Sequence, residues 1–181
     1  MTTETIAASA GGTSASARFS LGIDLGTTHC ALSWVDKAAS DGERVAQGVL
    51  AIPQLTAPAS VEARALLPSF LYLPHESEFS PADLALPWPA DAPPEVQRVS
   101  PLAASTRYLQ HLRRAWTEAH PDAPFDAQDV TVTIPASFDP AARELTAEAC
   151  KAAGFQRHTL LEEPQAALYS WIQASAGAWR K

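Results

Sequence analysis

The chain has 181 residues, of which 46% are apolar and 18% charged, so it can fold around one core but is too short for both lobes of a large two-lobed enzyme. Its net charge of -7 argues against a nucleic-acid partner, because binding a phosphate backbone requires clustered Lys and Arg. No run approaches the ~20 consecutive apolar residues of a membrane span, so we expect no membrane partner either.

The first 18 residues are mostly small and polar. They lack the basic start and the continuous apolar stretch of a secretory signal. We therefore predict a disordered N-terminal tail over residues 1–18 and a cytoplasmic location.

Regular patterning begins at Phe19. The strings FSLGIDL and HCALSWVD both alternate in the manner of β-strands, and the small turn residues GTT join them. This arrangement predicts a β-hairpin.

The chain is rich in proline between Pro53 and Pro101. Within this stretch, Leu67 to Leu73 has the composition of a short strand. Residues 74–99 have no usable periodicity, and their prolines cannot lie inside helices or central strands. We predict a shortened, irregular segment there.

Helix signals return at Ser100, a capping residue followed by Pro101 in the first turn. The predicted helix carries apolar residues near one face: Leu102, Leu109, Leu112 and Trp116. A strand is predicted from Val130 to Phe138.

The same cap-then-proline signal recurs at Asp139 and Pro140, and Gly154 can take the left-handed conformation that closes a helix. This second helix is expected to bury a stripe of Leu145, Ala149 and Ala152. A strand over Thr159 to Leu161 and a helix opened by Pro164 follow. Strand, helix, strand, helix predicts an α/β fold, with a sheet and helices packed on its faces.

The string GIDLGTTHC, Gly22 to Cys30, places a carboxylate at the end of an apolar strand, directly before a glycine turn. Gly26 lets the backbone approach an anion, and Thr27 and Thr28 can donate N–H and O–H groups to phosphate oxygens. Asp24 can hold Mg²⁺ through water. Because a β-patterned run follows, rather than a helix, the pattern favours a phosphate-binding hairpin over a P-loop. The alternative is an ordinary turn beside a solvated Asp.

A second group of candidates lies in VTVTIPASFDPAARELTAEACKAAGF and LLEEPQAALYSWI. Pro135 ends the strand, and Arg143 can reach back from the first turn of the helix. Glu163 lies between a strand and a helix, where α/β sheets present ligand-facing groups, and it can orient a water or share a hydrated metal with Asp24. The alternative is a carboxylate favoured by the helix dipole. Glu162 competes for the same assignment.

Three strings together resemble the heat shock protein 70 (DnaK-type) chaperones. GIDLGTTHCAL resembles the first phosphate motif of that family, VTIPASFDPAARELTAEACKAAGF its strand-helix segment, and LLEEPQAAL its N-E-P-x-A-A-x signature. LPSFLYL resembles the family's T-P-S strand. The resemblance implies lobe I of an actin-like (ribonuclease H-like) ATPase domain, with a mixed sheet and flanking helices over residues 19–181.

The resemblance also implies roles for residues and cofactors. Asp24 and Glu163 would be the catalytic and Mg²⁺-side carboxylates, the metal being held through water. Gly26, Thr27, Thr28 and His29 would bind the phosphates of ATP or ADP. Pro135 and Arg143 would be a switch that relays the nucleotide state.

Two departures from the family pattern bear on activity. No lysine occurs between Pro68 and Asp129, where the family has one that stabilises the transferring phosphate. The sequence also ends at Lys181, before a glycine-rich second phosphate loop, an adenosine-binding segment or a peptide-binding domain. We therefore expect an N-terminal fragment without the second lobe, which would meet unfolded peptide clients and co-chaperones only through missing domains. Its turnover alone should be very slow.

Two other readings share parts of this pattern. Sugar and glycerol kinases of the same superfold also begin with I-D-x-G-T-T, but they lack VTIPASF and EEPQAAL. A non-catalytic interaction module derived from the lobe would keep the fold and lose the chemistry.

Overall fold

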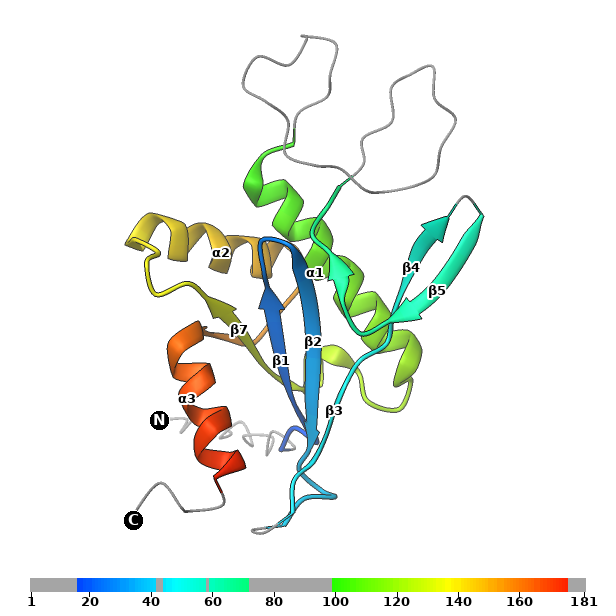
Figure 1. The fold of residues 1–181 in the computed structure, drawn as a ribbon, viewed down its shortest axis with the longest axis vertical. Helices are drawn as coiled ribbons and strands as arrows, with labels where there is room; N and C mark the ends of the chain where they lie inside the picture. The colour runs from blue at the N-terminus through cyan, green and yellow to red at the C-terminus, as the bar shows by residue number, and fades with distance from the viewer. Residues whose placement is uncertain (1–15, 42–43, 58, 72–98, 176–181) are drawn as a thin grey trace, which may run out of the picture.

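The computed structural model describes residues 16–41, 44–57, 59–71 and 99–175, which form an α/β structure with helices on both faces of a mixed sheet (Figure 1). The main sheet has the order β3-β2-β1-β7-β8, with β6 also paired to β2. Its strands are β1 (Phe19–Leu25), β2 (His29–Asp36), β3 (Ala46–Val49), β6 (Leu67–Pro68), β7 (Asp129–Ile134) and β8 (His158–Glu162). A separate two-stranded sheet consists of β4 (Ile52–Ala57) and β5 (Ser60–Arg64).

Three α-helices and one short 3-10 turn complete the described part. They are α1 (Pro101–Ala119), α2 (Pro140–Ala152), α3 (Glu163–Ala174) and the 3-10 turn η1 (Phe125–Ala127). None of the helices in the described ranges has the length and apolar character needed to cross a bilayer.

The predicted hairpin is confirmed. β1 and β2 are antiparallel, with register from Phe19 opposite Asp36 to Leu25 opposite Cys30. β1 pairs in parallel with β7, and β7 in parallel with β8. The carboxyl ends of β1, β7 and β8 therefore meet at one edge of the sheet.

Alternation along the strands gives the sheet two different faces. One face is apolar and packs against α1 and α2, whose Leu109 and Trp116 are fully buried in the same cluster. The sheet residues on this face are Leu21, Ile23, Cys30, Leu32, Val130 and Val132. The other face carries smaller and more polar residues, and α3 lies on that side (Figure 1).

The predicted helix caps are also confirmed. The side chain of Ser100 accepts a hydrogen bond from the N–H of Ala103, and that of Asp139 accepts one from Ala142. Gly154 has φ of +87°, the left-handed conformation expected of it.

The predicted buried stripe on α2 is wrong at two of its three positions. Ala149 is buried, but Leu145 is 49% exposed and Ala152 is also exposed. The residues that pack inward are instead Ala149, Cys150 and the following Ala153. Small side chains there let α2 approach α1 closely, so tertiary packing, rather than side-chain size, decides which face is buried.

Two predicted strands are too long. The strand expected from Val130 to Phe138 ends at Ile134, because Pro135 has no N–H and its carbonyl instead accepts a turn hydrogen bond from Phe138. In the strand expected over 67–73, only Leu67 and Pro68 pair with β2, and residues 72–73 lie outside the described residues. The irregular segment predicted over 74–99 also lies outside them, apart from its last residue.

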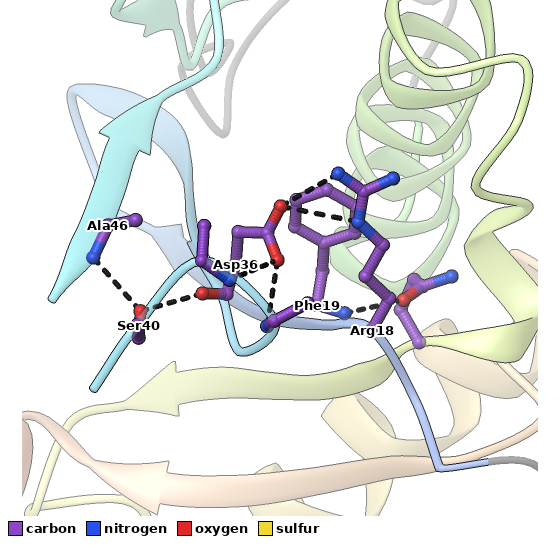
Figure 2. Close-up of polar contacts among 8 residues, drawn as sticks. Arg18, Phe19, Asp36, Ser40 and Ala46 are labelled. Carbon is purple, nitrogen blue, oxygen red and sulfur yellow. Dashed lines mark hydrogen bonds and ion pairs between the residues drawn. The ribbon is translucent and has the colours of Figure 1, made fainter. Parts of the chain in front are cut away.

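The end of the hairpin opposite the GTT turn is closed by a polar network (Figure 2). Arg18 donates two hydrogen bonds to Asp36, at 3.2 and 2.8 Å, and the other carboxylate oxygen accepts from the N–H groups of Ala38 and Ala39. The Ser40 hydroxyl donates to the Asp36 carbonyl and accepts from the N–H of Ala46, which begins β3. These contacts fix how the chain passes from β2 to β3.

Candidate functional site

The candidate site lies at the edge where β1, β7 and β8 end. In open α/β sheets, ligands bind outside the carboxyl ends of the strands, where the following loops gather. Here those loops are the Gly26–Thr28 turn after β1, the 135–138 turn after β7, and the start of α3 after β8. All the residues predicted from sequence for the site belong to β1 or β2, these loops, or the helices that follow them.

The turn after β1 requires glycine and is braced from a distant segment. A Cβ added to Gly26 would lie 2.4 Å from the carbonyl oxygen of His29, which no side chain can tolerate without a backbone shift. The Ser69 hydroxyl donates to the Gly26 carbonyl at 2.6 Å, and the Ser69 N–H donates to the Thr28 carbonyl at 2.9 Å. Ser69 thus holds two carbonyls of the turn.

The donors of the same turn remain available. Thr27, Thr28 and His29 are exposed. Within the described ranges, neither the hydroxyls nor the backbone N–H groups of Thr27 and Thr28 have a hydrogen-bond partner. A turn whose carbonyls are occupied and whose donors are free is suited to bind an anion.

Asp24, the carboxylate beside the turn, is exposed and held by β7. Its Oδ1 accepts a hydrogen bond of 3.0 Å from the Thr133 hydroxyl, its neighbour in the parallel register. No other hydrogen bond or ion pair to the Asp24 side chain is formed within the described residues. The second carboxylate oxygen is therefore free to accept from solvent or from metal-bound water.

The structure separates the roles of Glu162 and Glu163. Glu162 ends β8 and forms an ion pair with Arg143 of α2, whose Nε also donates to the carbonyl of Phe138 at 3.2 Å. Glu163 is the first residue of α3, is exposed, and has no side-chain partner in the described part of the chain. Of the two carboxylates, Glu163 is the one left free to act on a ligand.

Arg143 reaches back from the first turn of α2, as predicted. It connects the turn that begins at Pro135 with the end of β8, through Phe138 and Glu162. A displacement of the Pro135 turn would therefore also displace Glu162, the residue directly before Glu163.

An open hollow of about 450 Å³ lies beside Asp24 on the polar face of the sheet. Thr133 and Gly22 form part of its floor, and Tyr169 of α3 forms part of its wall. Three large apolar side chains of α3 are about half exposed: Leu168 at 50%, Tyr169 at 58% and Trp171 at 55%. Together these exposed apolar groups make this face of α3 a candidate interaction surface.

Neither of the two lysines in the described residues, Lys37 and Lys151, lies at this edge. Lys37 forms an ion pair with Asp129, which lies at the amino end of β7, and Lys151 lies in the last turn of α2. In the described residues, no group of three or more His, Cys, Asp or Glu side chains is placed to hold a metal. A metal at this edge would have to be held largely through water and the ligand itself.

Two residues of the site were not predicted. Thr133 and Ser69 hold the Asp24 carboxylate and the turn, from 109 and 43 residues away in the sequence. The strings that contain them, VTVTIP and LPSF, were recognised as strands. The position of Thr133 two residues before Pro135, on the polar face of an alternating strand, was the available signal.

A scan against protein-family models and a search of the curated proteins both find no match to this chain.

Proposed function

We propose that this chain is the first lobe of an actin-like ATPase related to the heat shock protein 70 chaperones, and that it binds the phosphates of Mg·ATP at the Gly26–Thr28 turn. One observation supports this most strongly. The carbonyls of Gly26 and Thr28 accept hydrogen bonds from Ser69, while the N–H and O–H donors of Thr27 and Thr28 have no partner among the described residues and lie directly beside the Asp24 carboxylate.

The residues present fit a hydrated Mg²⁺. Asp24 has one oxygen engaged by Thr133 and one free, so it can accept from a metal-bound water without approaching the phosphate itself. Glu163 begins the helix at the same edge and offers a second unpaired carboxylate. When bound, Mg²⁺ would neutralise part of the phosphate charge. Asp24 and Glu163 would orient its water shell, and Glu163 would also orient the attacking water.

The proposed switch role of Pro135 and Arg143 rests on the resemblance and on the hydrogen bonds that Arg143 forms. Arg143 joins the Pro135 turn to Glu162, so a nucleotide that moves Glu163 would also move that turn. In a longer protein this turn would pass the nucleotide state to a peptide-binding domain, which is how clients and co-chaperones would be reached.

Turnover by these 181 residues should be very slow. Loss of one positioned charge at a transferring phosphate typically costs a factor of a hundred or more in rate, on the order of several kcal/mol. The two lysines within the described residues lie elsewhere, one paired with Asp129 and one at the end of α2. We propose binding of nucleotide with little hydrolysis.

A second candidate function is a non-catalytic interaction module. It is favoured by the exposed apolar side chains of α3, Leu168, Tyr169 and Trp171, beside the polar face of the sheet. In this alternative the fold presents α3 to a partner, and the turn after β1 has no ligand.

Calorimetric titration of the purified chain with Mg·ATP tests the proposal. Asp24→Asn keeps the acceptor for Thr133 but removes the charge, and Asp122→Asn makes the same change in the exposed loop after α1. We expect binding by the parent chain, a loss of affinity of at least about tenfold in Asp24→Asn, and no change in Asp122→Asn.

Each alternative gives a different result. No binding of Mg·ATP by the parent chain would contradict the proposal and favour the interaction module. Phosphorylation of glycerol or a hexose by bound ATP would favour the sugar or glycerol kinase alternative.

A further inference from the structure

A groove lies away from the candidate phosphate site, between α1 and the β4–β5 hairpin. Its volume is about 690 Å³. The two walls are joined at one point, where Nε2 of His111 lies 2.8 Å from the carbonyl oxygen of Pro53. In Figure 1 the hairpin projects beside α1, well away from β1.

One wall of the groove is apolar. Leu55 and Val61 are directly paired across β4 and β5, so both side chains lie on the same face of the hairpin. Val61 is 64% exposed. Phe70 and Leu71 extend this wall after β6.

The opposite wall carries positive charge. Arg107 and Arg114 of α1 line the groove and are exposed, and neither forms an ion pair within the described ranges. The neighbouring Arg113, in contrast, is paired with Asp126. Seven residues along a helix, about two turns, place the Cα atoms of Arg107 and Arg114 about 10 Å apart on one side.

Two further groups complete this wall. Tyr108 lines the groove, and its phenol, whose pKa burial raises to about 12, can donate a hydrogen bond to an anionic acceptor. Glu118 lies about one helical turn beyond Arg114. The wall is therefore positive along the part from Arg107 to Arg114 and negative at its other end.

We propose that this groove docks an extended segment of a partner protein in which apolar and acidic side chains alternate. In an extended chain, successive side chains point to opposite sides, so such a segment would direct its apolar residues to the hairpin and its carboxylates to Arg107 and Arg114. From Arg107 to Glu118 the helical wall is about 16 Å long, which matches about five extended residues. The unpaired cations facing an exposed apolar wall select this chemistry over a purely apolar peptide.

The docking proposal does not depend on the proposed ATP binding. None of the groove's lining residues belongs to the Gly26–Thr28 turn or to β1, β7 or β8. Either proposal can therefore fail while the other stands.

Fluorescence anisotropy with a labelled peptide of alternating leucine and aspartate tests the docking. The full chain should bind this probe and discriminate against the peptide with lysine in place of aspartate. Arg107→Glu combined with Arg114→Glu should weaken binding of the aspartate probe by at least about tenfold and should now favour the lysine probe. Lys151→Glu, an exposed charge reversal on α2, is the control and should change neither.

Other outcomes overturn the proposal. Equal binding of both probes, or an unchanged affinity in the double variant with its helical circular dichroism intact, would show that the cations do not select the ligand. If the probe binds only after residues 72–98 are replaced by a Gly-Ser linker, the occupant is the chain's own segment. If the parent chain dimerises in sedimentation and the double variant does not, the occupant is a second copy.

Discussion

Gly26 is the residue with the least freedom in the proposed phosphate-binding turn, because an added Cβ would meet a backbone carbonyl at 2.4 Å. We predict that Gly26→Ala lowers the free energy of unfolding by roughly 1–3 kcal/mol and abolishes Mg·ATP binding. Urea denaturation measures the first effect. Gly22→Ala is a matched control: its Cβ would meet only the Ser33 hydroxyl at 2.9 Å, a side chain that can rotate. An equal loss in both variants would show that the turn is not specially constrained.

Asp36 makes stability depend on pH at the opposite end of the hairpin. Hydrogen bonding from Arg18, followed by the N–H groups of Ala38 and Ala39, lowers the pKa of Asp36 below its usual value of 3.8. A carboxyl whose pKa is lowered by folding contributes stability above its unfolded pKa and loses it as the pH falls through the folded one. The contribution of Asp36 should therefore be complete at neutral pH, decline once the pH falls below about 4, and be lost only below the lowered pKa of the folded state.

Asp36→Asn separates the charge from the shape, since its amide oxygen can still accept from the backbone. We predict a lower urea midpoint at pH 7 and a smaller decline between pH 5 and pH 2, measured by denaturation across that range. If the urea midpoints of the parent and the variant declined equally between pH 5 and pH 2, the ionised Asp36 carboxylate would not contribute to stability in this way.

Residues of the site differ in how well sequence can predict them. Asp24 and Gly26 follow from one continuous string, because the strand, the carboxylate and the turn are adjacent in the chain. Ser69, directly after β6, and Thr133 of β7 contact that string and become its neighbours only through strand pairing. Glu162 and Glu163 became distinguishable only once Arg143 was found beside the first of them.

At the scale of the elements, the starts of the helices α1 and α2 were predicted correctly from the sequence, whereas the buried face of α2 was not. Ser100 and Asp139 cap α1 and α2 where expected, because a cap is a local hydrogen bond. Leu145 was expected in the core but is half exposed, since α2 turns its small residues toward α1. A helix's start is encoded locally, whereas the side that it buries depends on its neighbour.

The cap of α2 can be measured directly. Asp139→Ala removes the acceptor for the N–H of Ala142 and should cost about 1 kcal/mol of stability, measured by thermal or urea unfolding. Glu148→Ala, at an exposed position later in the same helix, should change stability by less than about 0.5 kcal/mol. A negligible effect of Asp139→Ala would show that tertiary packing alone holds the start of α2.

For the molecule as a whole, the hairpin and the order strand, helix, strand, helix were predictable, and β3, β4 and β5 were not. These three strands lie in a stretch where polar residues and Pro53 weaken the alternation of apolar and polar side chains. In the described residues, β4 and β5 pair only with each other. β3 pairs with β2, and β4 contacts α1 through Pro53 and His111, so contacts with other elements rather than a local pattern position these strands.

The same division between core and surface predicts opposite behaviour for two tryptophans. Trp116 is fully buried and donates to the carbonyl of Ala123 at 2.8 Å, so Trp116→Phe should cost about 1–3 kcal/mol by leaving that carbonyl unpaired. Trp171 is 55% exposed, and Trp171→Phe should change stability by less than about 0.5 kcal/mol. Urea denaturation compares them, and similar losses would place α3 in the folding core.

The most direct test of the proposed phosphate site is a titration of the isotopically labelled chain with Mg·ATP, in which the amide resonances are monitored by NMR. If the turn after β1 binds phosphate, the largest shifts should occur at Gly26, Thr27 and Thr28, with smaller ones at Ser69 and Thr133, which hold the turn and Asp24. Shifts confined to α1 and the β4–β5 hairpin, or none at millimolar nucleotide, would contradict the assignment of this sheet edge as a phosphate site.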